Sequence, residues 1–242
     1  MLFGEDSRQT HGVNFNSSGD YALGTGYYYD NDKIDVYKFH KQDGSLSYDG
    51  SIVLGDDENY VAFTHYTSWI NNRKAYTVTM QFGPTSLTPK GTRIIGPGVW
   101  LLDVESRTAK KVIGTAKHVN DGGVYRSASD LAVVGSKLYI AEEDSIDDNF
   151  GDDGYVSVFD IRDIDNPVFL KRFKPGDELP TDFSVTHSLI VTPDGRYIYA
   201  DSYASNYIIK IDTQRDQVVK VFNKNDHGLI MPHAGFISGT IR

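Results

Sequence analysis

The sequence predicts an all-β fold built of repeated four-stranded antiparallel units. Three observations support this prediction. Helix periodicity is nearly absent, whereas short runs rich in Val, Ile, Tyr and Phe alternate with polar residues between Gly, Asp and Asn turns. The 242 residues are 39% hydrophobic and 12% aromatic, which is enough for a folded core. Finally, similar turn-and-strand units recur along the chain.

Individual strands can be assigned from these runs in chain order. The clearest cover residues 33–41, 138–142, 155–161, 197–200, 206–212 and 217–222. Three turns, Ser18-Gly19, Gly135-Ser136 and Asp194-Gly195, have the composition of β-hairpins. An innermost strand is expected over Thr10–Phe15.

The repeat is anchored on the turn before the second strand of each unit. Gly19, Asn72, Gly135 and Gly195 occupy this turn at spacings of 53, 63 and 60 residues, and a tyrosine-containing strand follows each. A third strand and a closing fourth strand complete every unit, the fourth strands being SIVL (51–54), KKVIGT (110–115), VFLKRF (168–173) and VVKVF (218–222). Four strands per unit are typical of a β-propeller blade. A β-sandwich is the alternative, but the recurring order of the elements favours the propeller.

We therefore predict one β-propeller domain over residues 1–242. Its blades cover about 10–55, 60–116, 124–175 and 183–224, and residues 229–242 begin a fifth. A seven-bladed ring needs on the order of 350–400 residues. The expectation is thus a partial ring of a seven-bladed propeller, completed by self-association or by missing blades.

The composition excludes several classes of function. There is no cysteine, which excludes thiolate metal sites, cysteine nucleophiles and iron–sulfur ligation. The 33 acidic residues outnumber the 24 Lys and Arg, giving a net charge of −9 without basic clusters, so no nucleic acid partner is expected. No run approaches the roughly 18 apolar residues of a membrane helix, so no membrane insertion is expected.

Residues 191–222 resemble one repeat of the YVTN-type seven-bladed propellers. Thr192-Pro193-Asp194-Gly195 matches the turn of that repeat, and Asn206 and Ile211-Asp212 match its third strand. The match is good over this blade and looser over the other three. The resemblance implies the fold, and the family includes binding proteins, lactonases and metalloenzymes.

Histidines recur at one point of the repeat. His11, His65 and His187 lie seven or eight residues before their anchor turns, and His233 begins the predicted fifth unit. In the third unit Ser127 or Ala128 takes the equivalent place. Residues at equal offsets on successive blades of a propeller face a common axis. Two interpretations follow: structural histidines that bond backbone between blades, or a histidine-lined axial site.

A histidine-lined site without thiolates suits a transition metal, with copper or zinc as the expected cofactor. His118 and His227 lie in loops near the same face and could join it. Four further residues are candidates for the wall of a ligand pocket, Tyr66, Trp69, Tyr125 and Arg126. His40, at the end of an outer-type strand, is expected to be a solvated edge residue.

The histidine pattern is similar to that of the copper propellers, the nitrous-oxide reductase and thiocyanate dehydrogenase types. The resemblance implies that His11, His65, His187 and His233 hold copper, with His118 and His227 as further ligands. Nitrous-oxide reductases also carry a cysteine-containing cupredoxin domain, whereas these 242 residues contain no cysteine.

A second metal candidate is the acidic segment 142–154, with seven carboxylates. Oxygen ligands in a glycine-punctuated loop suit calcium, although the spacing is not that of an EF-hand. The candidate ligands are Asp144, Asp147, Asp148 and Asp152. The alternative is a solvated acidic loop.

Three functions remain open at this point. The first is a metal-dependent oxidoreductase, copper favoured, that acts on a small-molecule substrate. The second is a non-catalytic scaffold that binds a small molecule or a protein ligand. The third is a lactonase-like hydrolase using His187 with Arg126. An acidic, cysteine-free propeller with a calcium loop resembles exported propellers, so a periplasmic or extracellular location is expected.

Overall fold

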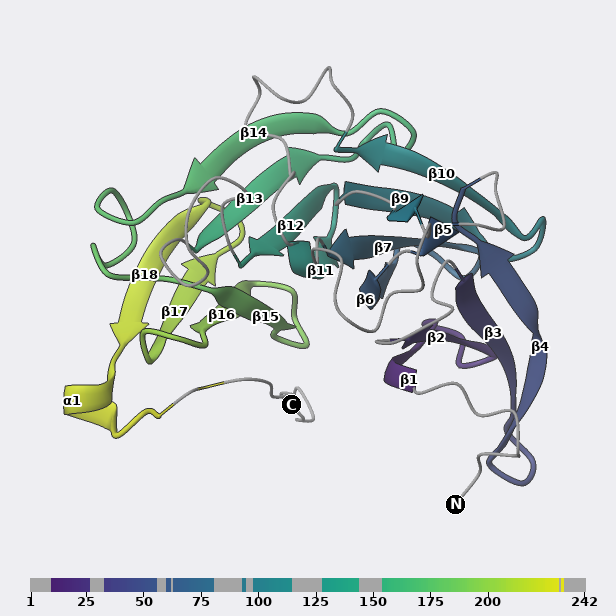
Figure 1. Cartoon of the computed structure of the whole chain (residues 1–242). Coiled ribbons are helices and arrows are strands. Elements are labelled where there is room, and N and C mark those ends of the chain that lie inside the picture. Colours follow the sequence, from purple (N-terminus) through teal and green to yellow (C-terminus); the bar gives the residue numbers. More distant parts are fainter. Residues whose placement is uncertain are drawn as a thin grey trace. The chain divides into compact units, whose positions relative to one another are not determined.

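The computed structural model describes residues 10–26, 33–55, 60–61, 63–80, 93–94, 98–114, 128–143, 154–230 and 232 (Figure 1). Over these residues the protein is all-β, with four four-stranded antiparallel sheets that form the predicted blades. The chain divides into two compact units, residues 1–115 and 116–242. In the parts of the chain just given, no helix combines the length and hydrophobicity needed to cross a membrane.

The first unit contains two blades. The strands of the first blade pair in chain order, β1 (Thr10–Phe15), β2 (Tyr21–Gly26), β3 (Lys33–His40) and β4 (Ser45–Val53). The second blade is built from β6 (Phe63–Trp69), β7 (Lys74–Met80), β9 (Gly98–Asp103) and β10 (Thr108–Ile113). A two-stranded parallel sheet of β5 (Tyr60–Val61) and β8 (Arg93–Ile94) accompanies them. Strand β6 lies against β1 and β2, so neighbouring blades meet at their first strands.

The second unit repeats this arrangement. The third blade contains β11 (Ala128–Val134), β12 (Lys137–Glu142), β13 (Tyr155–Asp160) and β14 (Val168–Phe173). The fourth contains β15 (Thr186–Val191), β16 (Tyr197–Ser202), β17 (Tyr207–Asp212) and β18 (Gln217–Phe222), followed by the short helix α1 (Lys224–His227). Strand β15 lies against β11 and β12.

The predicted strands lie within two residues of the observed ends, except at β4. Strand β4 begins at Ser45, earlier than the predicted SIVL segment, because it continues the hairpin with β3 and pairs Ser45 with His40. Its first part is polar and partly exposed, so the hydrophobic pattern does not mark it. The short elements β5, β8 and α1 span too few residues for a periodic pattern and were not predicted.

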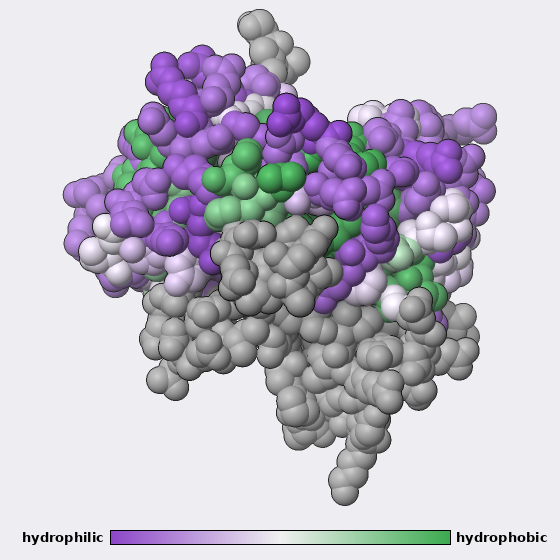
Figure 2. Space-filling view, turned by 90° about the horizontal axis from the view of Figure 1, so that it is seen from above, coloured by the Kyte–Doolittle hydropathy of each residue, from purple (hydrophilic) through white to green (hydrophobic). Residues whose placement is uncertain are grey.

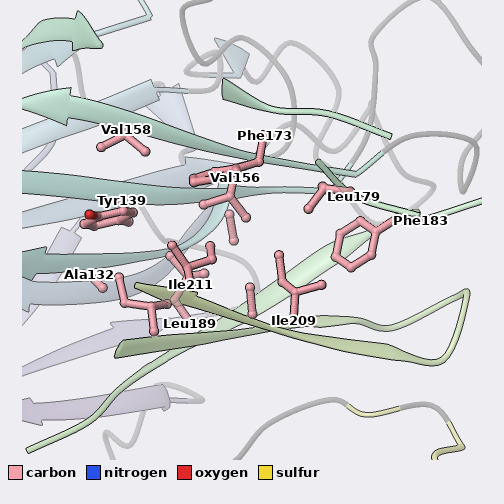
Figure 3. Packing of buried hydrophobic residues seen from close by; sticks show 13 residues of the cluster. Ala132, Tyr139, Val156, Val158, Phe173, Leu179, Phe183, Leu189, Ile209 and Ile211 are labelled. Atoms are coloured by element: carbon pink, nitrogen blue, oxygen red, sulfur yellow. The ribbon is translucent and has the colours of Figure 1, made fainter. Parts of the chain in front are cut away.

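Alternate residues of each blade build the cores. In the second unit, inward-facing residues of the third and fourth blades form one cluster that includes Tyr139, Val156, Phe173, Ile209 and Ile211, all fully buried (Figure 3). In the first unit, Leu23, Ile34 and Val36 of the first blade pack with Trp100 and Leu102 of the second. Strand residues two apart share a face, so each blade buries one face against its neighbour. On the side shown in Figure 2, hydrophilic residues cover most of the described surface.

Candidate functional site

The first strand of every blade has a β-bulge near its beginning. The strand register shifts between Thr10 and Gly12, Thr64 and Thr67, Ala128 and Asp130, and Thr186 and Leu189. A bulge adds one residue to a strand and redirects its side chain. Three of the predicted histidines, His11, His65 and His187, occupy these bulges, so the sequence repeat reflects a repeated backbone feature.

The bulge residue of the third blade is Ser129, one or two positions after the predicted Ser127 or Ala128. The difference arises because the turn that follows β15 is longer than the turn that follows β11, which displaces the anchor glycine.

Hydroxyl groups join neighbouring blades at the bulges. In the first unit Thr25 Oγ1 donates to the carbonyl oxygen of His65 at 2.6 Å. In the second unit Ser129 Oγ donates to the carbonyl oxygen of Thr186 at 2.8 Å. Each bond runs from one blade to the bulge of the next, and it fixes the backbone where the bulge side chains emerge.

His187 is the centre of the candidate site in the second unit. Its Nδ1 atom contacts Oε1 of Glu143, which directly follows β12 of the neighbouring blade. Both side chains are at least nine-tenths buried, with exposed fractions of 10% and 5%. The pair therefore joins the third blade to the bulge of the fourth and sets the orientation of the imidazole ring.

Two further buried carboxylates lie on the strands around His187. Asp201 of β16 accepts from the backbone N–H groups of His187 and Ser188, at 3.2 and 2.9 Å, and so holds the bulge. Asp130 of β11 accepts from the N–H groups of Leu131 and Leu189, both at 2.7 Å. Asp130 thereby bridges the two blades.

Burial has the largest effect on the pKa values of Asp130 and Asp201. It raises the pKa of Asp130 to about 7 and that of Asp201 to about 6, although the N–H donors and His187 oppose the shift. For His187, burial lowers the pKa, but Glu143, Asp201 and Asp130 outweigh it, and the net direction is upward. The surroundings of the imidazole are therefore acidic and favour a cation.

Glu142 and Glu143 do not belong to a solvated acidic loop. Glu142 is fully buried, and Arg172 of β14 donates to both of its carboxylate oxygens, at 2.9 and 3.0 Å. Ser157 of β13 also donates to it. The four candidate calcium ligands, Asp144, Asp147, Asp148 and Asp152, lie outside the described residues.

The segment leading into His187 has an unusual backbone. Val185 has a φ of +51°, a left-handed conformation that is strained for a β-branched residue. Gly154 allows the close approach, because a Cβ atom there would lie 2.7 Å from the Val185 nitrogen. The adjacent Thr186 is fully buried, and its hydroxyl finds no hydrogen-bond partner in the described part of the chain.

The other predicted residues lie in varied places. His65 is buried, with its ring edge-on to Tyr66 at a centroid distance of 4.8 Å. Trp69 donates to the carbonyl oxygen of Asn14 at 3.0 Å and packs on the core of the first unit. His227 is exposed on α1, where its ring contacts Phe222. His40, as expected, is exposed, and its ring contacts the Ser47 hydroxyl.

The remaining candidates, His118, Tyr125, Arg126 and His233, lie outside the described residues, and of His11 only the backbone is described. Within the described ranges, no three histidine or acidic side chains are grouped so as to hold a metal ion. The full metal-ligand set and the pocket wall therefore stay predictions.

Sequence reasoning missed three residues of the cluster. Glu143 was assigned to the acidic segment, and Asp130 and Asp201 were not singled out. A signal was present for the last two, because each is an aspartate inside an otherwise apolar strand, in SDLAVV and YIYAD. Buried charges of that kind are rare unless they are bonded.

No family model and no curated protein matches this sequence. Several solved structures are similar. Hydrazine synthase of Kuenenia stuttgartiensis aligns with a TM-score of 0.60 and 12% identity, over 88% of this chain and 62% of that chain. A putative 6-phosphogluconolactonase from Bacteroides uniformis aligns with a TM-score of 0.61 and 14% identity, over 96% and 60%. The Cps50 (Swd1) β-propeller domain of Myceliophteria thermophila aligns with a TM-score of 0.52 and 14% identity, over 90% and 56%.

These identities establish the fold alone: the chain is of β-propeller type. It spans between 56% and 62% of the lengths of the three structures.

Proposed function

We propose that this chain is a ligand-binding β-propeller module that holds a divalent transition-metal ion at His187. The contact between Glu143 and Nδ1 of His187 carries the proposal. A carboxylate on one ring nitrogen fixes the tautomer in which the other nitrogen bears the lone pair, as is usual for metal-binding histidines. Asp201 and Asp130 add negative potential once they are ionised, above the raised pKa of each, and that potential favours a cation at the same place.

The donor set around His187 bears on which metal would bind. His187 would be the ligand, through Nε2, and Glu143 would orient it. Asp130 and Asp201 accept backbone N–H groups, so their role is to hold the strands that carry the ligand. The site predicted for copper or zinc is lined by histidines, whereas carboxylates surround His187. Because zinc also accepts carboxylate surroundings, zinc fits at least as well as copper.

A bound ion would supply Lewis-acid or redox chemistry to a small molecule. His11, His65 and His233, with His118 and His227, remain the proposed further ligands, and an exported location remains part of the proposal.

Equilibrium dialysis against Zn²⁺ and Cu²⁺ tests the metal site. His187→Ala should lower the affinity by at least about tenfold, and Glu143→Gln should lower it by roughly 10- to 100-fold, as for other outer partners of metal-binding histidines. His40→Ala is the matched control, because this histidine is exposed and is not among the proposed ligands. Equal metal binding by the wild type and His187→Ala would refute the proposal.

The same contact favours a second candidate, a metal-independent hydrolase in which His187 is the general base. A base whose second nitrogen is held by a carboxylate is the usual arrangement for proton transfer at a histidine. A panel of lactones and aryl esters, assayed with and without EDTA, separates the candidates. Hydrolysis that survives EDTA but not His187→Ala supports this second candidate and argues against the first.

A further inference from the structure

The fourth blade has one face covered by the third blade and another that faces away from it. Ile198, Ala200, Ile209 and Ile211 are buried against the third blade. Strand alternation turns the intervening residues to the opposite side. We name these residues the open face of the fourth blade: Tyr197, Tyr199, Ile208, Lys210, Lys220 and Phe222.

The side chains of this open face contact one another. The Lys210 ammonium lies 3.6 Å from the ring centroid of Tyr197 and 5.6 Å from that of Tyr199. The Lys220 ammonium lies 4.6 Å from the ring centroid of Phe222. None of the residues of the open face is fully buried.

The register shows that this face repeats one that is covered in the third blade. In the third blade, Tyr139 pairs with Val158, and Val158 with Lys171. In the fourth blade, the matching row is Tyr199, Lys210 and Lys220. Tyr139 and Val158 are fully buried beneath the fourth blade. The open face therefore has the architecture of a blade-to-blade contact surface, with Lys210 in place of a buried valine.

The first blade has a complementary surface on the side away from the second blade. Ile34 and Val36 of β3 are buried against the second blade, so alternation turns Asp35 and Tyr37 to the other side. We name the open face of the first blade by its residues Val13, Phe15, Asp35, Tyr37 and Tyr48. Val13, Phe15 and Tyr48 are 44%, 44% and 60% exposed.

The two open faces match in charge. Asp35 and Tyr37 pair with Gly24 and Ala22, just as Ile209 and Ile211 of the fourth blade pair with Ala200 and Ile198. Asp35 thus occupies the place of Ile209, a residue that packs against the third blade. In the contact between the third and fourth blades, the two matching positions are occupied by Val158 and Ile209. Lys210 takes the place of Val158 on one open face, and Asp35 takes the place of Ile209 on the other.

We propose that the open face of the fourth blade docks on the open face of the first blade of a second copy of this chain, head to tail, with Lys210 facing Asp35. Aromatic side chains on both faces supply the apolar contact, and the two charges select the partner face. Asp35 also accepts from Ser51 at 2.8 Å, which holds its carboxylate in place. The proposal is independent of any metal at His187.

Sedimentation velocity and light scattering over a wide range of protein concentration test this interface. The expected result is a mass that rises from the 27.0 kDa monomer to at least twice that value. Lys210→Glu and Asp35→Lys should each weaken association by at least about tenfold, because like charges then meet. The double variant restores opposite charges and should associate like the wild type.

Lys174→Glu is the charge-matched control, since Lys174 is exposed outside the open face. Circular dichroism confirms that each variant is folded. A monomer at every concentration would overturn the proposal, as would single variants that associate like the wild type or a double variant that associates no better than the single ones.

Discussion

Arg107 and Asp216 occupy the same position in the second and fourth blades but carry opposite charges. Each ends the turn before the outermost strand, and each has a left-handed backbone, with φ of +58° and +50°. Arg107 forms an ion pair with Asp49 of the first blade. Asp216 accepts from Lys137 at 2.6 Å and from the hydroxyl of Tyr139 in the third blade. The equivalent turn therefore forms an ion pair with the preceding blade in both units, through a cation in the first unit and through a carboxylate in the second.

We predict that Asp216→Ala destabilises the protein by about 2–3 kcal/mol, because the partly buried Lys137 and Tyr139 lose a charged acceptor. Arg107→Ala should cost only about 1 kcal/mol, since Asp49 retains Lys38 at 2.9 Å. Urea denaturation measures the two stability changes, and amide hydrogen exchange shows in which unit each change occurs. A loss of protection in the first unit on changing Asp216, or equal costs for the two variants, would contradict this account.

The pair of Glu142 and Arg172 is predicted to be the most sensitive ion pair of the third blade. Glu142 is fully buried and the Arg172 side chain is 15% exposed, so Arg172→Ala removes the cation that donates to both oxygens of a buried carboxylate. The expected cost is about 3–5 kcal/mol. Chemical denaturation gives the value.

Arg162→Ala is the control for this pair, because Arg162 is 80% exposed beside Asp160. Its cost should be within about 1 kcal/mol. If the two arginine variants lose similar stability, Glu142 is not the buried charge that the contacts indicate.

Gly154→Ala is predicted to disturb the site through the backbone. The new Cβ would lie 2.7 Å from the nitrogen of Val185, a contact with backbone that cannot rotate away. We expect a loss of about 2 kcal/mol or more and a changed NMR signal of the His187 imidazole, as an overpacked contact must shift its neighbours. Gly135→Ala is the control: its φ of +59° makes the substitution cost stability, but a Cβ there meets nothing within 4 Å, so the imidazole signal should stay unchanged.

The strands were predictable because alternation and turn residues are local properties. Thr10–Phe15 and Gln217–Phe222 were predicted with the observed bounds. The equivalence of His11, His65 and His187 also followed from the sequence, because one bulge recurs in the first strands. The partner of His187 did not follow, since Glu143 lies 44 residues away and reaches it only across a blade contact.

Stability should fall as the pH rises through the range in which Asp130 titrates. Its pKa is raised to about 7 from 3.8, so between about pH 4 and 7 the folded chain holds a proton that the unfolded chain has released. The loss is on the order of 4 kcal/mol across this window. Asp201 and His187, whose pKa values are also raised, act in the same direction.

Asp130→Asn removes this titration. Its free energy of unfolding should lack this loss, so relative to the wild type the variant should gain on the order of 4 kcal/mol between about pH 4 and 7. Urea denaturation at several pH values measures both curves. Parallel curves for the two proteins would show that Asp130 does not titrate in this range.

A metal ion bound to His187 would be visible by anomalous diffraction at the zinc absorption edge, measured from crystals of the zinc-loaded protein. We expect a peak within bonding distance of Nε2 of His187, about 2.0–2.1 Å, while Nδ1 keeps its contact with Glu143. Zinc density elsewhere with none at His187, or a zinc-loaded protein without an ordered peak, would contradict it.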